Sequence, residues 1–179
     1  SQTDDFTKKC KADPSGKAAP PDPAQVGRHA AMKMVLPGAR PVIAPDPSLN
    51  RWHSAAVGQA LWLSVNDPTA TKHESLSFMG QAVSLTARRN GLSFNMGDGH
   101  TVHCAATTPW SPSVEPGSPS PTCGYTYQQA APAGGYKVTA ITSWDVTWSV
   151  LGHTGTVHIE KAGGQMLPVG ELESVVTRR

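Results

Sequence analysis

The sequence has little charge of either sign and no long apolar run. Asp, Glu, Lys and Arg make up 16% of its 179 residues, and the formal net charge is only +2. So weak a field would not hold nucleic acid or an anionic membrane, and we expect neither as a partner. No apolar stretch approaches the length of a membrane span, so the sequence predicts no transmembrane segment.

Signals for catalysis and for cofactors are also scarce. The chain has no Gly-x-x-x-x-Gly-Lys-Ser/Thr loop to hold phosphates, which excludes a nucleotide site of that kind. His158 and Glu160 share a predicted strand face, which would suit a hydrolase, but no nucleophile stands out to join them. We therefore expect no cofactor and no enzymatic activity, and a hydrolase is the third of our functional hypotheses.

Cysteine is rare, with three residues in the chain. Cys104 and Cys123 would close a loop of about twenty residues, and a disulfide there would contribute about 3 kcal/mol by restricting the unfolded chain. Cys10 is then the odd one. It is free, or bonded to another chain, or bonded to one of the other two in place of its partner.

Histidines beside Cys104 raise the question of zinc. His100, His103 and Cys104, with His153 or His158 as further ligands, are the residue types that zinc prefers. Their spacing is loose, His100 and His103 would face opposite ways on a strand, and a disulfide-bonded Cys104 cannot ligate a metal. We therefore expect no metal site.

Turn-forming residues are what the sequence has in abundance. It contains 16 prolines and 17 glycines, which supply the preset or positive φ that turns between strands require. Together with the cysteines and the low charge, this composition is typical of an exported protein. The chain begins with Ser1, and we expect that a leader was removed and that the protein is secreted or attached to the cell surface.

The first fifty residues differ from the rest. Residues 1–50 hold half of the prolines and a group of lysines without hydrophobic periodicity, which predicts an extended, partly disordered arm. Within it, residues 24–36 can form a short helix, with Asp22 as N-cap, Pro23 in the first turn and Gly38 beyond the end. Residues 51–179 form the predicted folded domain.

From Trp52 onward the apolar pattern changes to a period of two, which predicts strands. The turn signal Asn90-Gly91 predicts a hairpin that joins one strand to the next. The expected strands cover residues 57–65, 76–81, 82–87 and 92–94.

The last predicted strand, residues 137–150, is the longest. Its even-numbered side chains are apolar except Thr142, and its odd-numbered ones are mostly polar, so one face should be buried and the other wet. Fourteen residues would span roughly 46 Å, which is too long for one small sandwich. We expect the strand to bend or bulge, or to continue into an extra C-terminal ribbon with residues 156–160 and 171–176, turning at Gly152 and at Gly163-Gly164.

Three motifs resemble those of the polycystic-kidney-disease (PKD) domain. They are the Phe-Asn-Met-Gly-Asp-Gly run at 94–99, Tyr125 with Tyr127, and the Gly-Tyr-Lys-Val-Thr-Ala run at 135–140. The resemblance covers roughly residues 57–150 and implies an all-β, immunoglobulin-like β-sandwich. Residues 56–63, 96–99 and 144–148, with cysteines flanking a Ser/Pro loop, also look like a group of secreted actinobacterial proteins. Such folds mostly bind or display other molecules.

The Gly97-Asp98-Gly99 run has two interpretations. Asp98 could bind calcium, but it would more simply accept hydrogen bonds from backbone amides of its own turn, while the glycines supply positive φ. We interpret the three residues as a structural turn.

Aromatic residues supply the candidate contact sites. Trp110 lies in the Pro/Ser loop between the cysteines and is the best candidate for an exposed anchor, because tryptophan is enriched among binding hot spots. Trp144 and Trp148 could form a platform for sugars, but their parity with apolar neighbours favours packing. Tyr125 is the fourth candidate. We expect a non-enzymatic extracellular interaction or assembly module that binds another surface protein, or alternatively a carbohydrate or cell-wall polysaccharide.

Overall fold

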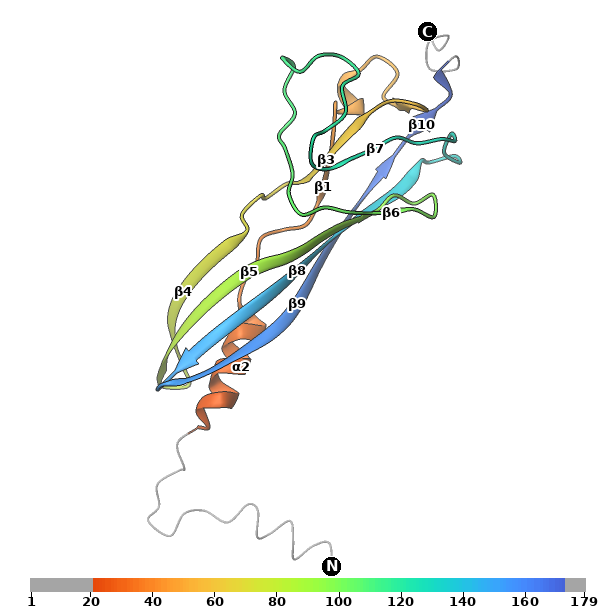
Figure 1. Ribbon diagram of the computed structural model, residues 1–179. Coiled ribbons are helices and arrows are strands. Elements are labelled where there is room, and N and C mark those ends of the chain that lie inside the picture. The colour runs from red at the N-terminus through yellow and green to blue at the C-terminus, as the bar shows by residue number, and fades with distance from the viewer. Residues whose placement is uncertain (1–20, 173–179) are drawn as a thin grey trace, which may run out of the picture.

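The computed structural model describes residues 21–172 and consists mainly of strands (Figure 1). It has an α-helix, α2 (Pro23–Lys33), and a 3-10 turn, η1 (Pro47–Leu49). The strands are β1 (Pro41–Ala44), β2 (Ala55–Ala56), β3 (Leu61–Val65), β4 (Thr71–Phe78), β5 (Gln81–Asn95), β6 (Thr101–His103), β7 (Gly124–Tyr125), β8 (Tyr136–Val150), β9 (His153–Leu167) and β10 (Val169–Gly170). The predicted all-β class is confirmed.

The largest sheet has the antiparallel order β4-β5-β8-β9, with β6 also paired to β5. A smaller sheet, β1-β3-β7, faces one half of it, and the short parallel pair β10-β2 lies at the same end (Figure 1). Helix α2 lies beneath the other half. The buried face of the long sheet is therefore covered by two different elements.

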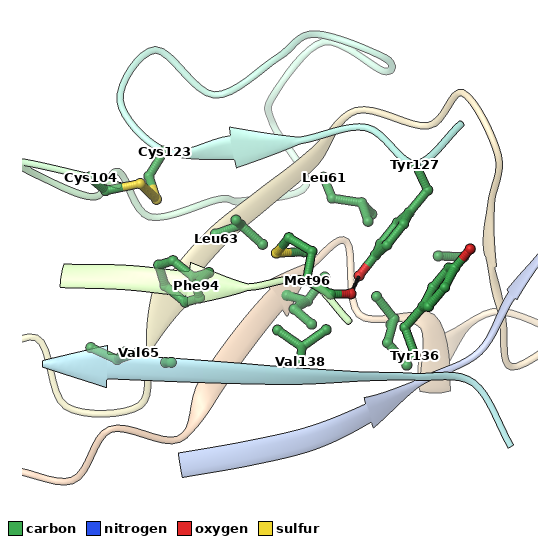
Figure 2. Close-up of a cluster of buried hydrophobic side chains, with 14 of the residues drawn as sticks. Leu61, Leu63, Val65, Phe94, Met96, Cys104, Cys123, Tyr127, Tyr136 and Val138 are labelled. Carbon is green, nitrogen blue, oxygen red and sulfur yellow. Dashed lines mark hydrogen bonds between the residues drawn. A yellow bond between two sulfur atoms is a disulfide. The ribbon is translucent and has the colours of Figure 1, made fainter. Parts of the chain in front are cut away.

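Strand β8 alternates between buried and exposed side chains as predicted. Its first half contributes Tyr136, Val138 and Ala140 to the buried side chains between the long sheet and the small sheet, which we call the upper cluster (Figure 2). Its second half contributes Trp144 and Trp148, among others, to the buried side chains between the long sheet and α2, which we call the lower cluster. The extra length of this strand thus extends the sheet beyond the two-sheet part, where the helix covers it.

The predicted hairpin at Asn90-Gly91 is wrong, because β5 runs through both residues as one strand of fifteen. Its register against β8 shifts between Arg89 and Gly91, so Asn90 is the extra residue of a β-bulge. Buried side chains are odd-numbered before the bulge and even-numbered after it. The bulge therefore keeps the apolar side chains of both halves of β5 on the same face.

Two other dipeptides form the tight hairpins. Met79-Gly80 joins β4 to β5, and Leu151-Gly152 joins β8 to β9, with positive φ at all four residues, as two-residue turns of this kind require. The turn at Gly152 was predicted. The turn predicted at Gly163-Gly164 is wrong, since β9 continues through it. A Cβ on Gly163 would lie 2.7 Å from the carbonyl oxygen of Ala39, so this glycine permits a close backbone crossing.

No separate C-terminal ribbon forms in the described part of the chain. Residues 156–160 lie within β9, which pairs with β8 along its whole length. The strand predicted at 171–176 falls mostly outside the described residues, and so do Cys10 and the predicted disorder of residues 1–20.

The boundary predicted between an arm and a domain at residue 50 does not hold for residues 21–50. The expected helix is present, with the Asp22 side chain accepting a hydrogen bond from Ala24 N. Its buried face packs on β5, β8 and β9, because the long sheet would otherwise expose its lower apolar face to water. Strand β1 then pairs with β3, so residues 41–44 belong to the small sheet.

The indole of Trp148 lies in a slot between two glycines. A Cβ built on Gly27 of α2 would lie 2.2 Å from the ring, and one on Gly155 of β9 would lie 2.4 Å from it. Neither position can carry a side chain unless the indole moves, and the indole is packed from both sides. These two glycines set how closely the helix approaches the sheet.

We predict that Gly27→Ala destabilises the protein. Alanine favours a helix over glycine by about 1 kcal/mol, but the clash with Trp148 should cost about 1–3 kcal/mol. Urea unfolding should therefore show a net loss of stability, and Trp148→Phe in the same chain should reduce that loss. A gain in stability in Gly27→Ala would mean that the slot is loose.

Candidate functional site

The Gly97-Asp98-Gly99 turn has the geometry that its sequence predicted. Both glycines have positive φ, and Asp98 Oδ1 accepts the backbone N–H of His100 at 3.0 Å. The other carboxylate oxygen, Oδ2, accepts a short hydrogen bond from the hydroxyl of Tyr125. A Cβ on Gly97 would meet backbone atoms of Lys137 at 2.7 Å. Asp98 therefore holds the turn through both of its carboxylate oxygens.

The three tyrosines of the chain form a ladder behind this turn. The rings of Tyr125 and Tyr127 meet edge to face at 4.9 Å, and those of Tyr127 and Tyr136 stack at 4.6 Å. The hydroxyl of Tyr127 donates to the carbonyl oxygen of Met96 at 2.7 Å, as Figure 2 shows. The ladder ties the loop that follows β7 to the turn after β5.

The ionisation of this cluster follows from its hydrogen bonds. Partial burial alone would raise the pKa of Asp98, but the donors from Tyr125 and His100, with the nearby His100 ring, bring it below its ordinary value of 3.8. Burial, followed by the hydrogen bond to Asp98, raises the pKa of Tyr125. Asp98 is thus an anion and Tyr125 a neutral donor at neutral pH. Tyr125, predicted as a contact residue, holds the turn through its hydroxyl.

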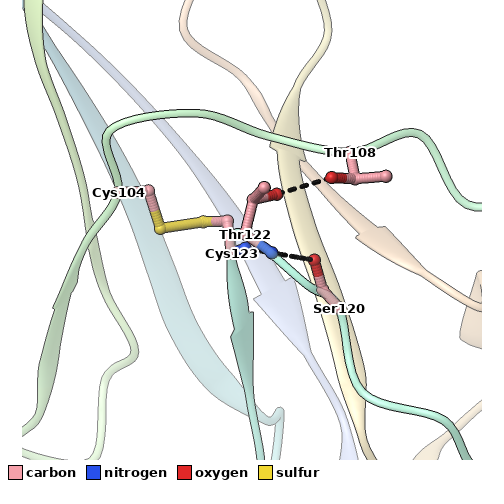
Figure 3. The surroundings of a disulfide bond; sticks show 5 residues. All are labelled: Cys104, Thr108, Ser120, Thr122 and Cys123. Atoms are coloured by element: carbon pink, nitrogen blue, oxygen red, sulfur yellow. Dashed lines mark hydrogen bonds between the residues drawn. A yellow bond between two sulfur atoms is a disulfide. The ribbon is translucent and has the colours of Figure 1, made fainter.

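The predicted disulfide between Cys104 and Cys123 is confirmed, with its Cα atoms 5.6 Å apart. Both cysteines are buried in the upper cluster. Near the bond, the hydroxyls of Thr108 and Thr122 are 2.7 Å apart, and Cys123 N donates to Ser120 Oγ (Figure 3). Residues 105–122 are therefore held at both ends as one tethered loop.

The tethered loop packs back on β3 and forms a groove. The Nε1 of Trp62 donates to the carbonyl oxygen of Ser118 at 2.8 Å, and Trp62 itself is only 7% exposed. A cavity of about 330 Å³ lies between them, lined by Pro45, Gln59, Trp62, Trp110, Pro112 and Glu115, among others. Trp110, expected to be exposed, is half-buried in its wall.

A second cavity of about 550 Å³ adjoins the first and shares Pro45 and Gln59 with it. Its wall also includes Trp52, whose Nε1 is buried without a hydrogen-bond partner among the described residues. Neighbouring His53 has a positive φ of 50°. Such a backbone conformation is strained for a residue other than glycine, and strained residues of this kind are concentrated at functional sites. We call the two cavities together the loop-end groove.

The charged side chains that line the loop-end groove are acidic, and the Arg51 guanidinium lies beside it, 5.6 Å from the centroid of the Trp52 ring. Asp46 and Glu115 are the charged side chains among the residues that line it. The remaining wall is made of proline, tryptophan, small apolar residues and uncharged polar ones. The groove therefore suits a ligand that combines apolar surface with hydrogen-bond donors or a positive charge.

Trp144 and Trp148 do not form an exposed platform. They are 1% and 6% exposed and belong to the lower cluster. The Nε1 of Trp144 donates to Thr142 Oγ1 at 3.1 Å, which explains why a threonine interrupts the apolar face. Both tryptophans are packing residues, and their proposed contact role is withdrawn.

The histidines lie apart from one another. His158 is on the open face of β9 with its side chain 80% exposed, and its Nδ1 is hydrogen-bonded to Asp145. Asp145 also accepts a hydrogen bond from Asn90, the bulge residue, at 2.8 Å. In the part of the chain that the structure describes, no group of three or more His, Cys, Asp or Glu side chains could hold a metal ion. None of its helices is long and apolar enough to cross a membrane.

Sequence reasoning missed most of the groove. Trp52 was noted only as the place where the apolar period changes, and Trp62 only as part of a strand. The available signal was the presence of tryptophans near prolines, which are residue types that often line binding grooves. The groove itself depends on how the tethered loop folds back. The bond between Tyr125 and Asp98 was likewise missed, because 27 residues separate them.

We predict that Tyr125→Phe lowers stability at neutral pH and makes it less sensitive to acid. The folded-state pKa of Asp98 lies below its unfolded value, so its contribution is present above about pH 4 and is lost as the pH falls through the folded value. Without the hydroxyl, urea unfolding at pH 7 should show a loss of about 1–2 kcal/mol, and the difference between pH 7 and pH 3 should shrink.

The control is Tyr136→Phe, whose hydroxyl donates to the backbone carbonyls of Gln129 and Ala130. These carbonyls do not titrate, so its cost should be the same at every pH. A pH-independent loss in Tyr125→Phe would contradict the assignment.

No protein-family model, curated protein or solved structure matches this chain. The predicted resemblance to the PKD domain therefore rests on the quoted motifs alone. The class of fold, the disulfide and the loop-end groove rest on the structure.

Proposed function

We propose that this protein is a non-enzymatic interaction module that works outside the cytoplasm and binds another protein in its loop-end groove. The observation that carries the proposal is the convergence of Trp52, Trp62 and Trp110 on two adjoining cavities. Tryptophan is enriched among binding hot spots. The tether between Cys104 and Cys123 holds part of the wall in place, which lowers the entropy lost on binding.

The chemistry of the wall favours a proline-containing, basic peptide segment as the ligand. Proline-rich segments bind to grooves lined by aromatic side chains because their extended conformation costs little entropy. Asp46 and Glu115 would attract a lysine or arginine of such a segment. The mixed apolar and anionic wall is the support for a protein partner.

The setting outside the cytoplasm is supported by the disulfide, since such bonds persist in oxidising compartments. The proposed immunoglobulin-like, PKD-type sandwich corresponds to the upper half, where the small sheet packs on the long one. Many proteins with sandwiches of this type bind partners through the loops at one end of the sheets. The loop-end groove occupies such an end.

Carbohydrate binding is the second candidate, favoured by the larger cavity. The side-chain amide of Gln59 keeps its N–H group for a ligand beside Trp52, and such a group hydrogen-bonds a sugar hydroxyl while an indole contacts the ring. The Asn50 amide is already bonded to the backbone of Trp52 and Ser54. Because Trp144 and Trp148 are buried, the loop-end groove is where a carbohydrate would bind.

We predict that Trp110→Ala weakens partner binding at least tenfold, as expected for a hot-spot tryptophan, while the fold is kept because Trp110 is half-buried. The matched control is Leu151→Ala, which removes an exposed apolar side chain at the hairpin far from the groove. Tagged forms of all three proteins are incubated with an envelope extract of the producing cell, and captured proteins are quantified by mass spectrometry.

Support requires a protein that the wild type and Leu151→Ala capture and Trp110→Ala does not. The same three proteins are tested on chitin, peptidoglycan and arabinogalactan. Polysaccharide binding that Trp110→Ala loses would replace the protein partner by a carbohydrate. No difference between the two variants in either assay would overturn the groove as the binding site.

A further inference from the structure

Strand β9 forms one edge of the long sheet. Its fifteen residues pair with β8 on one side, and no backbone group of residues 21–172 pairs with it on the other (Figure 1). A row of unpaired N–H and C=O groups is a template for a further strand. This edge is separate from the loop-end groove.

The hairpin at Leu151-Gly152 determines which groups are free. In a two-residue hairpin the flanking residues, here Val150 and His153, exchange hydrogen bonds with each other, and every second pair does so further along. Odd-numbered residues of β9 are thus bonded to β8. The even-numbered residues 154–166 direct their N–H and C=O groups to the open edge.

The two edges of the sheet differ in their protection. Edge strands that avoid pairing are short, carry inward-pointing charges, or contain proline or a bulge. The opposite edge, β4, has eight residues and directs both Lys72 and Glu74 toward the inner face. Strand β9 is nearly twice as long, contains neither proline nor a bulge, and places only Lys161 inward among its acidic and lysine side chains. It is the less protected edge.

We propose that β9 pairs antiparallel with β9 of a second copy of this chain, with Ile159 on the two-fold axis. Edge-directed residues then face each other, so that His158 lies opposite the partner's Glu160 and Glu160 opposite the partner's His158. The two Ile159 side chains meet on the inner face, next to Val157 and Lys161. The result is one continuous sheet that joins the two copies.

Charge selects this register. His158 holds Asp145 through Nδ1, which leaves Nε2 for the opposite carboxylate. If the register shifts by two residues in one direction, His158 lies opposite His158 of the second copy. If it shifts in the other direction, Glu160 lies opposite Glu160 of the second copy. Like residues of one charge directly opposite each other are destabilising, whereas opposite charges contribute favourably. The proposed register places each Glu160 carboxylate opposite an imidazole instead of another carboxylate.

The pairing is extensive enough to hold two copies together. Residues 154 to 164 supply six edge-directed pairs, which exchange about twelve backbone hydrogen bonds. Gly155 and Gly163 lie opposite each other in this register, and the inner face at each is covered within its own copy, by the Trp148 indole and by the chain at Ala39. The interface goes beyond the proposed function, because the loop-end groove of each copy stays open.

Two measurements on the full chain test the proposal. Sedimentation over roughly a thousandfold range of concentration should show the mass double as concentration rises. Amide exchange followed by NMR should then show at least tenfold slower exchange at residues 154, 156, 158, 160, 162 and 164 in the concentrated sample. The odd-numbered amides of β9, already bonded to β8, should change little.

Variants separate pairing from folding. Ala162→Pro removes an edge-directed N–H without breaking the β8 ladder and should abolish the dimer, while Ala162→Ser keeps the N–H and the dimer. Glu160→Lys should weaken association at least tenfold, and Glu160→Gln should weaken it less. If Ala162→Pro fails to fold, the comparison of Glu160→Lys with Glu160→Gln tests the pairing, because Glu160 is exposed and neither substitution disturbs the core.

Three outcomes would overturn the proposal. One is a monomer at all concentrations. Another is a dimer in which the even-numbered amides exchange as fast as in the dilute sample, which would place the interface elsewhere. The third is protection of those amides in the monomer, which would mean that residues of the same chain outside the described range cover the edge.

Discussion

The alternation of side chains along β8 is the constraint on which the rest of the structure depends. One face of fifteen consecutive residues is buried, from Tyr136 to Val150, and leaving this apolar face in water would cost about 25 cal/mol for each square ångström. No single small sheet is long enough to cover it. The chain meets the constraint with two covers, a three-stranded sheet above and an amphipathic helix below. The remaining elements are arranged around that division.

Polar residues in this arrangement mainly hold distant segments together through hydrogen bonds. Asp98 and Tyr125 hold the turn beside the upper cluster, Asn90 and Asp145 hold the bulge, and Trp62 anchors the tethered loop. Each of these hydrogen bonds joins segments that are distant in the sequence, with partners 27, 55 and 56 positions apart. The loop-end groove therefore depends on long-range contacts, whereas the open edge of β9 follows from its local pairing with β8.

Local patterns allowed the sequence to predict much of the fold. The period of two predicted β8, the capping residues predicted the helix, and the interval between Cys104 and Cys123 predicted the disulfide. Prediction failed where tertiary packing overrides a local preference. Asn90-Gly91 favours a hairpin in isolation, yet its strand continues because both halves of β5 pair with β8. Gly163 looked like a turn residue, but it is small so that the chain at Ala39 can cross. The groove was missed because it is built from three separate segments.

Division of the core has a consequence for how the molecule can open. The upper and lower clusters share the backbones of β5 and β8 but no buried side chain, and the disulfide lies wholly in the upper one. Detachment of α2 would expose the Trp148 slot while the cross-linked half kept its packing. Cooperative units of this kind open with different free energies. Events at the helix can therefore reach the loops through the strands that run through both ends and through residues 34–40, which join the helix to β1.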